Sequence, residues 1–315
     1  MLMSAFYVIG GLILLAGAGE YFVRSAVSIA ARLSISPLII GLTIVAFGTS
    51  LPELTVSLGS ALSGQPDIAV GNVVGSNIAN MLLVLGLAAA ISPFAVGVAS
   101  VRRDSLVMLV ATLGVVGLSF YGQIPRFAGV AMIAVLIGYV MYAIRDDRSS
   151  SQESHEDIDD QMMSGGLPVY LVVGSVSLAG VVLGADLLIH GATFFARQLG
   201  VSEAVIGLTM VAVGTSLPEV VVSVIAAFRG HAAVAVGNVL GSNIFNILLI
   251  LGTTAAIAPL PIAPEIAHRD VWVMLFTTMM LVFFLRSDAR LTRWEGMIAL
   301  LVYALYIGVL YYRMG

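Results

Sequence analysis

The chain contains no cysteine and no lysine, and few charged residues of either sign. Of its 315 residues, 10% are charged and 59% are hydrophobic. The lack of cysteine excludes disulfides and thiolate metal sites. All 14 basic residues are arginine, and they form no cluster that would indicate nucleic-acid binding. The net charge of −4 is too small to indicate a class of partner.

Motifs for ATP use and for catalysis are also missing. The sequence has no Walker motif, which argues against an ATP-driven pump. It shows no Ser/His or paired catalytic Asp arrangement that would indicate an intramembrane enzyme. We therefore expect a protein that is not an enzyme and that uses no cofactor.

Long apolar runs dominate what the chain does contain. The mean hydropathy is +1.05, and segments of about 20 apolar residues, enough to cross a bilayer, fill most of the sequence. This pattern predicts an all-α polytopic membrane protein. We place ten spans near residues 4–23, 37–62, 67–91, 104–121, 127–144, 168–190, 203–228, 233–257, 270–286 and 295–312. The N-terminus carries no cleavage pattern, so we expect the first span to be retained.

One polar segment divides the chain into two halves. Residues 145–166 are rich in Ser, Asp and Glu, which is typical of a solvated flexible linker. It separates a first five-helix repeat, residues 1–144, from a second five-helix repeat, residues 167–315. The acidic run within it could also bind Ca²⁺ as a regulator, although it has no fixed loop geometry.

Two sequence blocks occur twice at one constant offset. Residues 43–53 (TIVAFGTSLPE) return as residues 209–219 (TMVAVGTSLPE), and residues 71–80 (GNVVGSNIAN) return as residues 237–246 (GNVLGSNIFN). The offset of 166 residues also holds around these blocks, so we define repeated motifs at 41–86 and 207–252. Each copy places one carboxylate, Glu53 or Glu219, in a long apolar stretch.

The two halves should have opposite orientations in the membrane. Because five is odd, the second half enters from the other side, which gives inverted repeats like those of secondary transporters with a midplane site. Ten arginines fall in the connections on one side and four on the other. The positive-inside rule then predicts a cytoplasmic linker and two extracytoplasmic termini, in the inner or plasma membrane of the cell.

The GTSLPE block offers oxygen ligands on a disturbed helix. Pro52 has no N–H for the carbonyl four residues back, at Gly48, so we expect a broken helix near the bilayer midplane. Thr49, Ser50 and Glu53 place two hydroxyls and a carboxylate within about one turn. Thr215, Ser216 and Glu219 repeat this set in the second half. Oxygen donors of this kind suit hard cations such as Ca²⁺ and Na⁺.

The GSNxxN block adds neutral oxygen donors. Ser76 and Asn80 are four residues apart and share one helix face, and Ser242 and Asn246 repeat the arrangement. With the first block, these side chains could supply the six to eight oxygens that Ca²⁺ takes. Two ionised Glu balance one Ca²⁺ or two Na⁺. Competition between the two ions is therefore natural on charge grounds.

Several readings stay open at this level. Two protonated Glu hydrogen-bonded in a packed bundle would also be compatible with burial. Glu20 and Asp186, near the ends of equivalent spans, are read as interface acids rather than ligands. The equivalent asparagines of the second block either cap broken helices or contact ions; they are Asn72, Asn77, Asn238 and Asn243.

At GTSLPE and GSNxxN the chain resembles the Ca²⁺:cation antiporter superfamily, and within it a prokaryotic calcium/sodium antiporter. The resemblance extends over essentially the full length and implies that spans 1 and 6 slide across the other eight. It also implies ion ligands at Thr49, Ser50, Glu53, Ser76, Asn80, Thr215, Ser216, Glu219, Ser242 and Asn246, with main-chain carbonyls at Ala46 and Ala212. Some members have Asp where this chain has Asn246, so a third carboxylate is missing here.

The expected function is secondary active exchange of Na⁺ for Ca²⁺ by alternating access through one midplane site. The motifs alone leave open a Ca²⁺/H⁺ exchanger of the same fold, because a buried Glu can carry a proton. A passive cation channel is the alternative from another class; inverted repeats with broken helices favour alternating access over it. The expected partners are Ca²⁺, Na⁺ or H⁺ and the lipid bilayer. Oligomeric state stays open.

Overall fold

The computed structural model describes residues 2–95, 98–150, 163–200, 214–285 and 290–314. Within these ranges, eight helices are long and apolar enough to cross a membrane, and a ninth span is formed by a bent helix pair. A further apolar helix, α11 (Leu217–Phe228), covers the end of the expected span 203–228. Residues 203–213 of that span lie outside the described residues. The all-α polytopic fold predicted from hydropathy is confirmed.

The helices follow the order of the expected spans. The first half contains α1 (Leu2–Leu33), α2 (Pro37–Ile40), α3 (Ala46–Thr49), α4 (Leu51–Leu62), α5 (Pro66–Ala79), α6 (Leu85–Ile91), α7 (Val98–Tyr121) and α8 (Arg126–Ser150). The second half contains α9 (Leu167–Gln198), α11, α12 (Ala232–Phe245), α13 (Gly252–Ile257), α14 (Val271–Phe284) and α15 (Arg293–Met314). In the described ranges, four π-helical segments interrupt them: η1 (Gly41–Val45), η2 (Asn80–Val84), η5 (Asn246–Leu251) and η6 (Ile266–Asp270).

The helix break lies at the serine of GTSLPE. Ser50 separates α3 from α4, and the two helices bend by 44° there. Pro52 is the second residue of α4, where a missing N–H costs no helical hydrogen bond. Ser216, which precedes α11, has nearly the same backbone angles, with φ −88° and ψ 2° against −83° and 5° at Ser50. Both copies of the motif therefore make the same turn.

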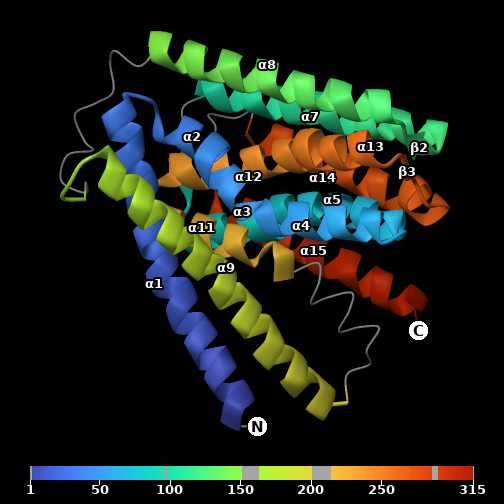
Figure 1. The fold of residues 1–315 in the computed structure, drawn as a ribbon, viewed down its shortest axis with the longest axis horizontal. Coiled ribbons are helices and arrows are strands. Elements are labelled where there is room, and N and C mark those ends of the chain that lie inside the picture. The colour runs from blue at the N-terminus through green and yellow to red at the C-terminus, as the bar shows by residue number, and fades with distance from the viewer. Residues whose placement is uncertain (1, 96–97, 151–162, 201–213, 286–289, 315) are drawn as a thin grey trace.

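Helices α1 and α9 form a close pair that crosses the other helices steeply (Figure 1). Glycine permits this contact: a Cβ on Gly11 would lie 2.8 Å from the carbonyl oxygen of Gly184. The hydroxyl of Ser25 adds a hydrogen bond of 2.6 Å to the carbonyl of Tyr170. Both helices, at 32 residues each, are longer than the expected spans 4–23 and 168–190. Helices of this length can cross a bilayer at a tilt.

Paired ionic contacts fix α7 and α14 in equivalent ways. Arg103 donates to Asp104 over 2.6 Å, and the hydroxyl of Tyr139 on α8 donates to the same carboxylate over 2.9 Å. In the second half, Arg269 donates to Asp270 over 2.8 Å, and Tyr306 on α15 donates to Asp270 over 3.1 Å. Pairing of this kind offsets the cost of burying a carboxylate.

Short strands tie the connecting loops together. Strand β1 (Phe94–Ala95) pairs antiparallel with β4 (Arg290–Leu291), and β2 (Gln123–Ile124) pairs antiparallel with β3 (Leu260–Pro261). Each pair joins a loop of the first half to a loop of the second. The loop before α7 therefore lies at the same end of the bundle as the loop before α15, as the inverted arrangement requires.

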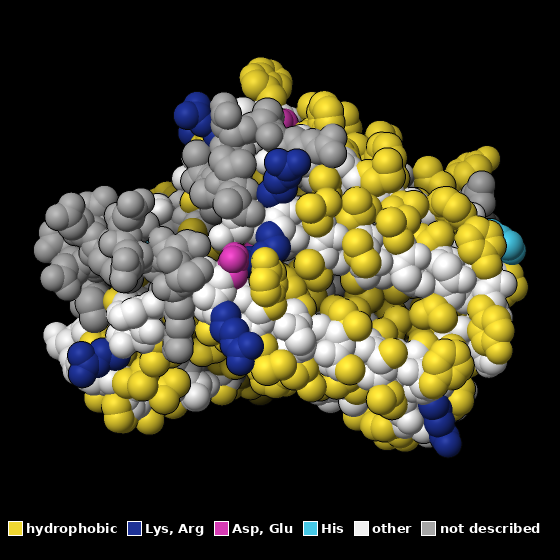
Figure 2. Space-filling model, turned by 90° about the horizontal axis from the view of Figure 1, so that it is seen from above, with side chains coloured by type: hydrophobic (Ala, Val, Ile, Leu, Met, Phe, Trp, Pro, Cys, Tyr) yellow, Lys and Arg dark blue, Asp and Glu magenta, His cyan; other side chains and the backbone are white. Residues whose placement is uncertain are grey.

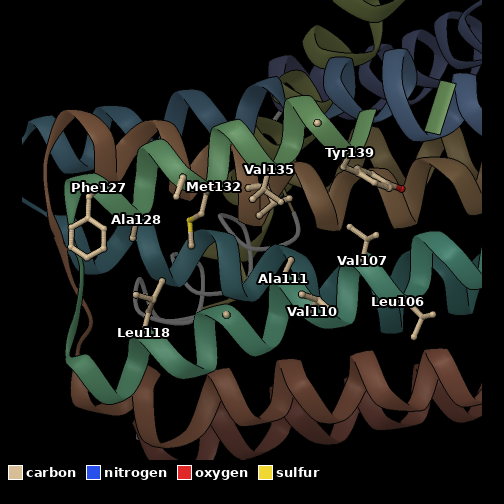
Figure 3. A pocket seen from close by; sticks show the side chains of 14 residues that line it. Leu106, Val107, Val110, Ala111, Leu118, Phe127, Ala128, Met132, Val135 and Tyr139 are labelled. Atoms are coloured by element: carbon tan, nitrogen blue, oxygen red, sulfur yellow. The ribbon is translucent and has the colours of Figure 1, made fainter. Parts of the chain in front are cut away.

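The outer face made by α7 and α8 is largely apolar, and most of the basic side chains in view lie toward one end (Figure 2). A groove of about 750 Å³ runs between the two helices. Its walls are apolar, from Phe127 and Leu118 at one end to Leu106 and Tyr139 at the other (Figure 3). None of the predicted ion ligands lines it.

Candidate cation site

Two cross-linked hydrogen bonds bring the repeated GTSLPE turns together at the centre of the bundle. The hydroxyl of Ser50 donates to Oε1 of Glu219 over 3.2 Å, and the hydroxyl of Ser216 donates to Oε1 of Glu53 over 3.3 Å. Both carboxylates are fully buried. Because each serine reaches the glutamate of the other repeat, the two turns build one site rather than two.

The threonines and asparagines of the motifs add a second layer of cross-links. Thr49 donates to Oδ1 of Asn238 over 3.1 Å, and Thr215 donates to Oδ1 of Asn72 over 3.5 Å. Asn72 in turn donates to Ser57 over 3.0 Å, and Asn238 donates to Ser223 over 2.9 Å. Asn72 and Asn238 thus bind hydroxyls of both repeated turns, whereas the sequence suggested that they either cap broken helices or contact ions. Ser57 and Ser223 were not singled out, although they too recur at the 166-residue offset.

Several predicted ligands keep a buried oxygen without a hydrogen-bond partner among the described residues. These atoms are Oε2 of Glu53, Oε2 of Glu219, the hydroxyls of Ser76 and Ser242, Oδ1 of Asn80 and Oδ1 of Asn246. A buried polar atom left unsatisfied costs about 1–3 kcal/mol, and more when it is charged. So many orphaned oxygens within the two repeated motifs fit a bound cation that accepts them as ligands.

The GSNxxN motifs lie on α5 and α12, with each final asparagine at the start of a π-helical segment. Asn80 opens η2 and Asn246 opens η5. A π-helical turn widens the helix and redirects side chains, and such turns frequently occur at functional sites. Both asparagines therefore lie directly after an α-helical segment, α5 or α12. The sequence gives no local signal for this change in helix type.

The two predicted main-chain ligands are the carbonyls of Ala46 and Ala212. The carbonyl of Ala46 accepts from the N–H of Ser50 over 3.0 Å, and the hydroxyl of Thr49, which donates to Asn238, lies 3.4 Å from it. It is therefore already engaged by a residue of the same motif. Ala212 lies outside the described residues.

Glu20 and Asp186 lie apart from these ligands. Glu20 makes ion pairs with Arg229, at 2.8 Å, and with Arg24, at 3.7 Å. Asp186 is 61% exposed and lies 3.4 Å from His190. Neither hydrogen-bonds to a predicted ligand in the described part of the chain, which fits their reading as interface acids.

The donor set is suited to a hard cation. It contains two carboxylates, several hydroxyls and two amide oxygens, with no nitrogen or sulfur ligand. Among the described residues, no group of three or more His, Cys, Asp and Glu side chains comes together. Any cation held here would therefore meet a charge of at most −2, which one Ca²⁺ or two Na⁺ would balance.

Comparison with known proteins places this geometry in a family. The family model described as "Sodium/calcium exchanger protein" matches residues 3–145 and 169–312. The putative antiporter CaxA of Alkalimonas amylolytica is 39% identical, over 97% of this chain and 98% of its own. The sodium/calcium exchanger MaX1 of Methanosarcina acetivorans is 33% identical, over 96% of this chain and 97% of its own.

Solved structures agree with the sequence relatives. Structures of the sodium-calcium exchanger NCX_Mj superpose on this chain with a TM-score of 0.84 and 32% sequence identity, covering 98% of both chains. Nearly the whole chain therefore has a counterpart in a protein of known architecture. The chain belongs to the sodium/calcium exchanger family, as its two repeated motifs predicted.

Proposed function

We propose that the protein is a secondary antiporter that exchanges Na⁺ for Ca²⁺ at a single site between its two repeats. The observation that carries this proposal is the cross-linking of Glu53 and Glu219 by serines of the opposite repeat. Two carboxylates at one buried centre bind either one Ca²⁺ or two Na⁺ at balanced charge. The remaining ligands are the hydroxyls, amide oxygens and carbonyls of both motifs, including Ala46 and Ala212.

Coupling follows from the cost of an empty site. Two unpaired carboxylates crossing an occluded apolar state would each cost several kcal/mol. The transporter therefore changes conformation readily only when a cation is bound. Because Ca²⁺ and Na⁺ use the same carboxylates, release of one ion on each side allows the other to bind, and exchange results.

The moving part of this proposal is the α1–α9 pair. It packs against the ion-binding turns through glycines of both motifs: a Cβ on Gly48 would lie 2.7 Å from Leu178 of α9, and one on Gly214 would lie 2.6 Å from Ile189 of α9. A helix this close to both turns can respond to ion binding there. We place the linker in the cytoplasm and both termini outside, following the distribution of arginines.

Uptake of ⁴⁵Ca²⁺ into proteoliposomes tests the function. We expect uptake driven by an outward Na⁺ gradient and little uptake with equal K⁺ or H⁺ gradients. Uptake driven by a pH gradient in sodium-free buffer would instead indicate Ca²⁺/H⁺ exchange. Ca²⁺ flux that is independent of any counter-gradient would indicate a channel and would contradict the proposal.

A further inference from the structure

The two halves differ at one pair of asparagines beside the cation site. Asn77 is equivalent to Asn243, and Asn80 to Asn246, in the 166-residue repeat. The amide nitrogen of Asn246 donates to Oδ1 of Asn77 over 3.0 Å, and both side chains are buried. The equivalent bond by the repeat would run from Asn80 to Asn243. Instead, Asn243 donates to the carbonyl of Val239 in its own helix, over 2.7 Å. Neither amide atom of Asn80 has a hydrogen-bond partner among the described residues.

The orientation of the Asn77 amide is determined by its other neighbours. Its nitrogen donates to the main-chain carbonyl of Asn243 over 3.4 Å and to the sulfur of Met274 over 3.8 Å. A carbonyl oxygen and a thioether sulfur can accept a hydrogen bond but cannot donate one. The NH₂ group of Asn77 must therefore face them, and its oxygen must face Asn246.

The same restriction passes on to Asn246. Because Oδ1 of Asn77 only accepts, Asn246 must present its NH₂ group to it. Its own Oδ1 then points away from Asn77, and this oxygen is buried without a hydrogen-bond partner in the described part of the chain. The site lies nearby, because helix α4, which carries Glu53, contacts the η5 segment that Asn246 opens.

We propose that Asn77 is a positioning residue that holds the amide oxygen of Asn246 toward the bound cation. The inference rests on the proposed exchange function. It makes Asn246 a ligand that is oriented before the ion arrives, whereas Asn80 is oriented only when the ion binds. Orienting a ligand in advance strengthens binding because less freedom is lost on association.

Kinetics of the Asn77→Leu variant test this role, because leucine has the same number and branching of side-chain heavy atoms as asparagine but forms no hydrogen bond. We expect the apparent KM for Ca²⁺ to rise about 5- to 20-fold, the effect of losing one hydrogen bond to a ligand. The maximal rate should stay within about twofold of wild type. Thr277→Val is the control, and its KM should also stay within about twofold of wild type because the buried Thr277 hydroxyl bonds within its own helix, to the carbonyl of Met274 over 3.0 Å.

A double-mutant cycle separates positioning from a general structural role. In Asn246→Asp, the two carboxylate oxygens are alike, so no amide orientation is needed. Asn77→Leu should then raise KM by less than about twofold in that background, or lower it, because the amide oxygen of Asn77 no longer faces a second acceptor. An equal rise in both backgrounds, or a wild-type KM in Asn77→Leu alone, would overturn the inference while Ca²⁺ transport itself stands.

If Asn77→Leu does not fold, as judged by size-exclusion chromatography, Asn77→Ala carries the same expectations. Absence of Na⁺-driven Ca²⁺ uptake in the wild type would overturn the proposed function itself.

Discussion

Replacing either central carboxylate should abolish exchange. In Glu53→Gln or Glu219→Gln, we expect the initial rate of Na⁺-driven ⁴⁵Ca²⁺ uptake to fall at least about 100-fold, because removing one charge from a buried ionic site costs about 3–5 kcal/mol. Glutamine keeps the volume of the side chain and an oxygen that accepts from Ser216 or Ser50. The loss would therefore report the charge itself. The symmetry of the two cross-links predicts effects of similar size in the two variants.

The matched control for these variants is Glu265→Gln, the same change at an exposed position outside the site. Its uptake should equal that of the wild type. Monodisperse elution and an unchanged melting temperature would show that the central variants are folded. Near-normal exchange in either folded central variant would refute the assignment of Glu53 and Glu219 as shared ligands.

Adding one methyl group at Gly237 should have the second largest effect. Gly237 of α12 faces α2 and η1, where an added Cβ would overlap the carbonyl oxygen of Leu38 and lie 2.9 Å from the nitrogen of Leu42. Gly41 makes the reverse contact, with its Cβ position 2.5 Å from the carbonyl oxygen of Val234. Both obstacles are main chain, so a side chain cannot rotate away to make room.

We therefore expect Gly237→Ala to lower the melting temperature in detergent by more than about 5 °C, and Gly237→Val to yield little folded protein, since overpacking a core costs about 1–3 kcal/mol or more. Gly114→Ala is the control, because a Cβ there has no described neighbour within 4 Å. That change should be neutral or stabilising, as alanine favours a helix over glycine. A Gly237→Ala protein that melts and transports like the wild type would show that the two backbones are not in contact.

The sequence predicted the parts of this structure that depend on composition and repetition. Hydropathy alone identified the membrane helices, because a bilayer requires long apolar segments whose backbone bonds are internal. The 166-residue repeat identified Glu53 and Glu219 as partners, since duplication places equivalent residues around one pseudo-twofold axis. The contact between Thr112 and Thr278, at 3.4 Å and 166 residues apart, marks such an axis in the fold.

Other features could not be predicted because no local pattern encodes them. The helix breaks at Ser50 rather than at Pro52, since proline is tolerated in the first turn of the helix that follows. The π-helical segments that begin at Asn80 and Asn246 depend on tertiary packing. The bond from Asn246 to Asn77 joins residues 169 positions apart. The equivalent bond, from Asn80 to Asn243, is absent from the described part of the chain. The repeated sequence predicts that equivalent residues make equivalent contacts, but Asn77 and Asn243 make different ones.

Anomalous diffraction from crystals grown with Sr²⁺ in place of Ca²⁺ tests the central claim most directly, because it locates the cation independently of transport. The account predicts one anomalous peak within the bundle, coordinated by carboxylate oxygens of both Glu53 and Glu219. Peaks that place the two carboxylates on separate cations, or a peak that neither of them contacts, would contradict it.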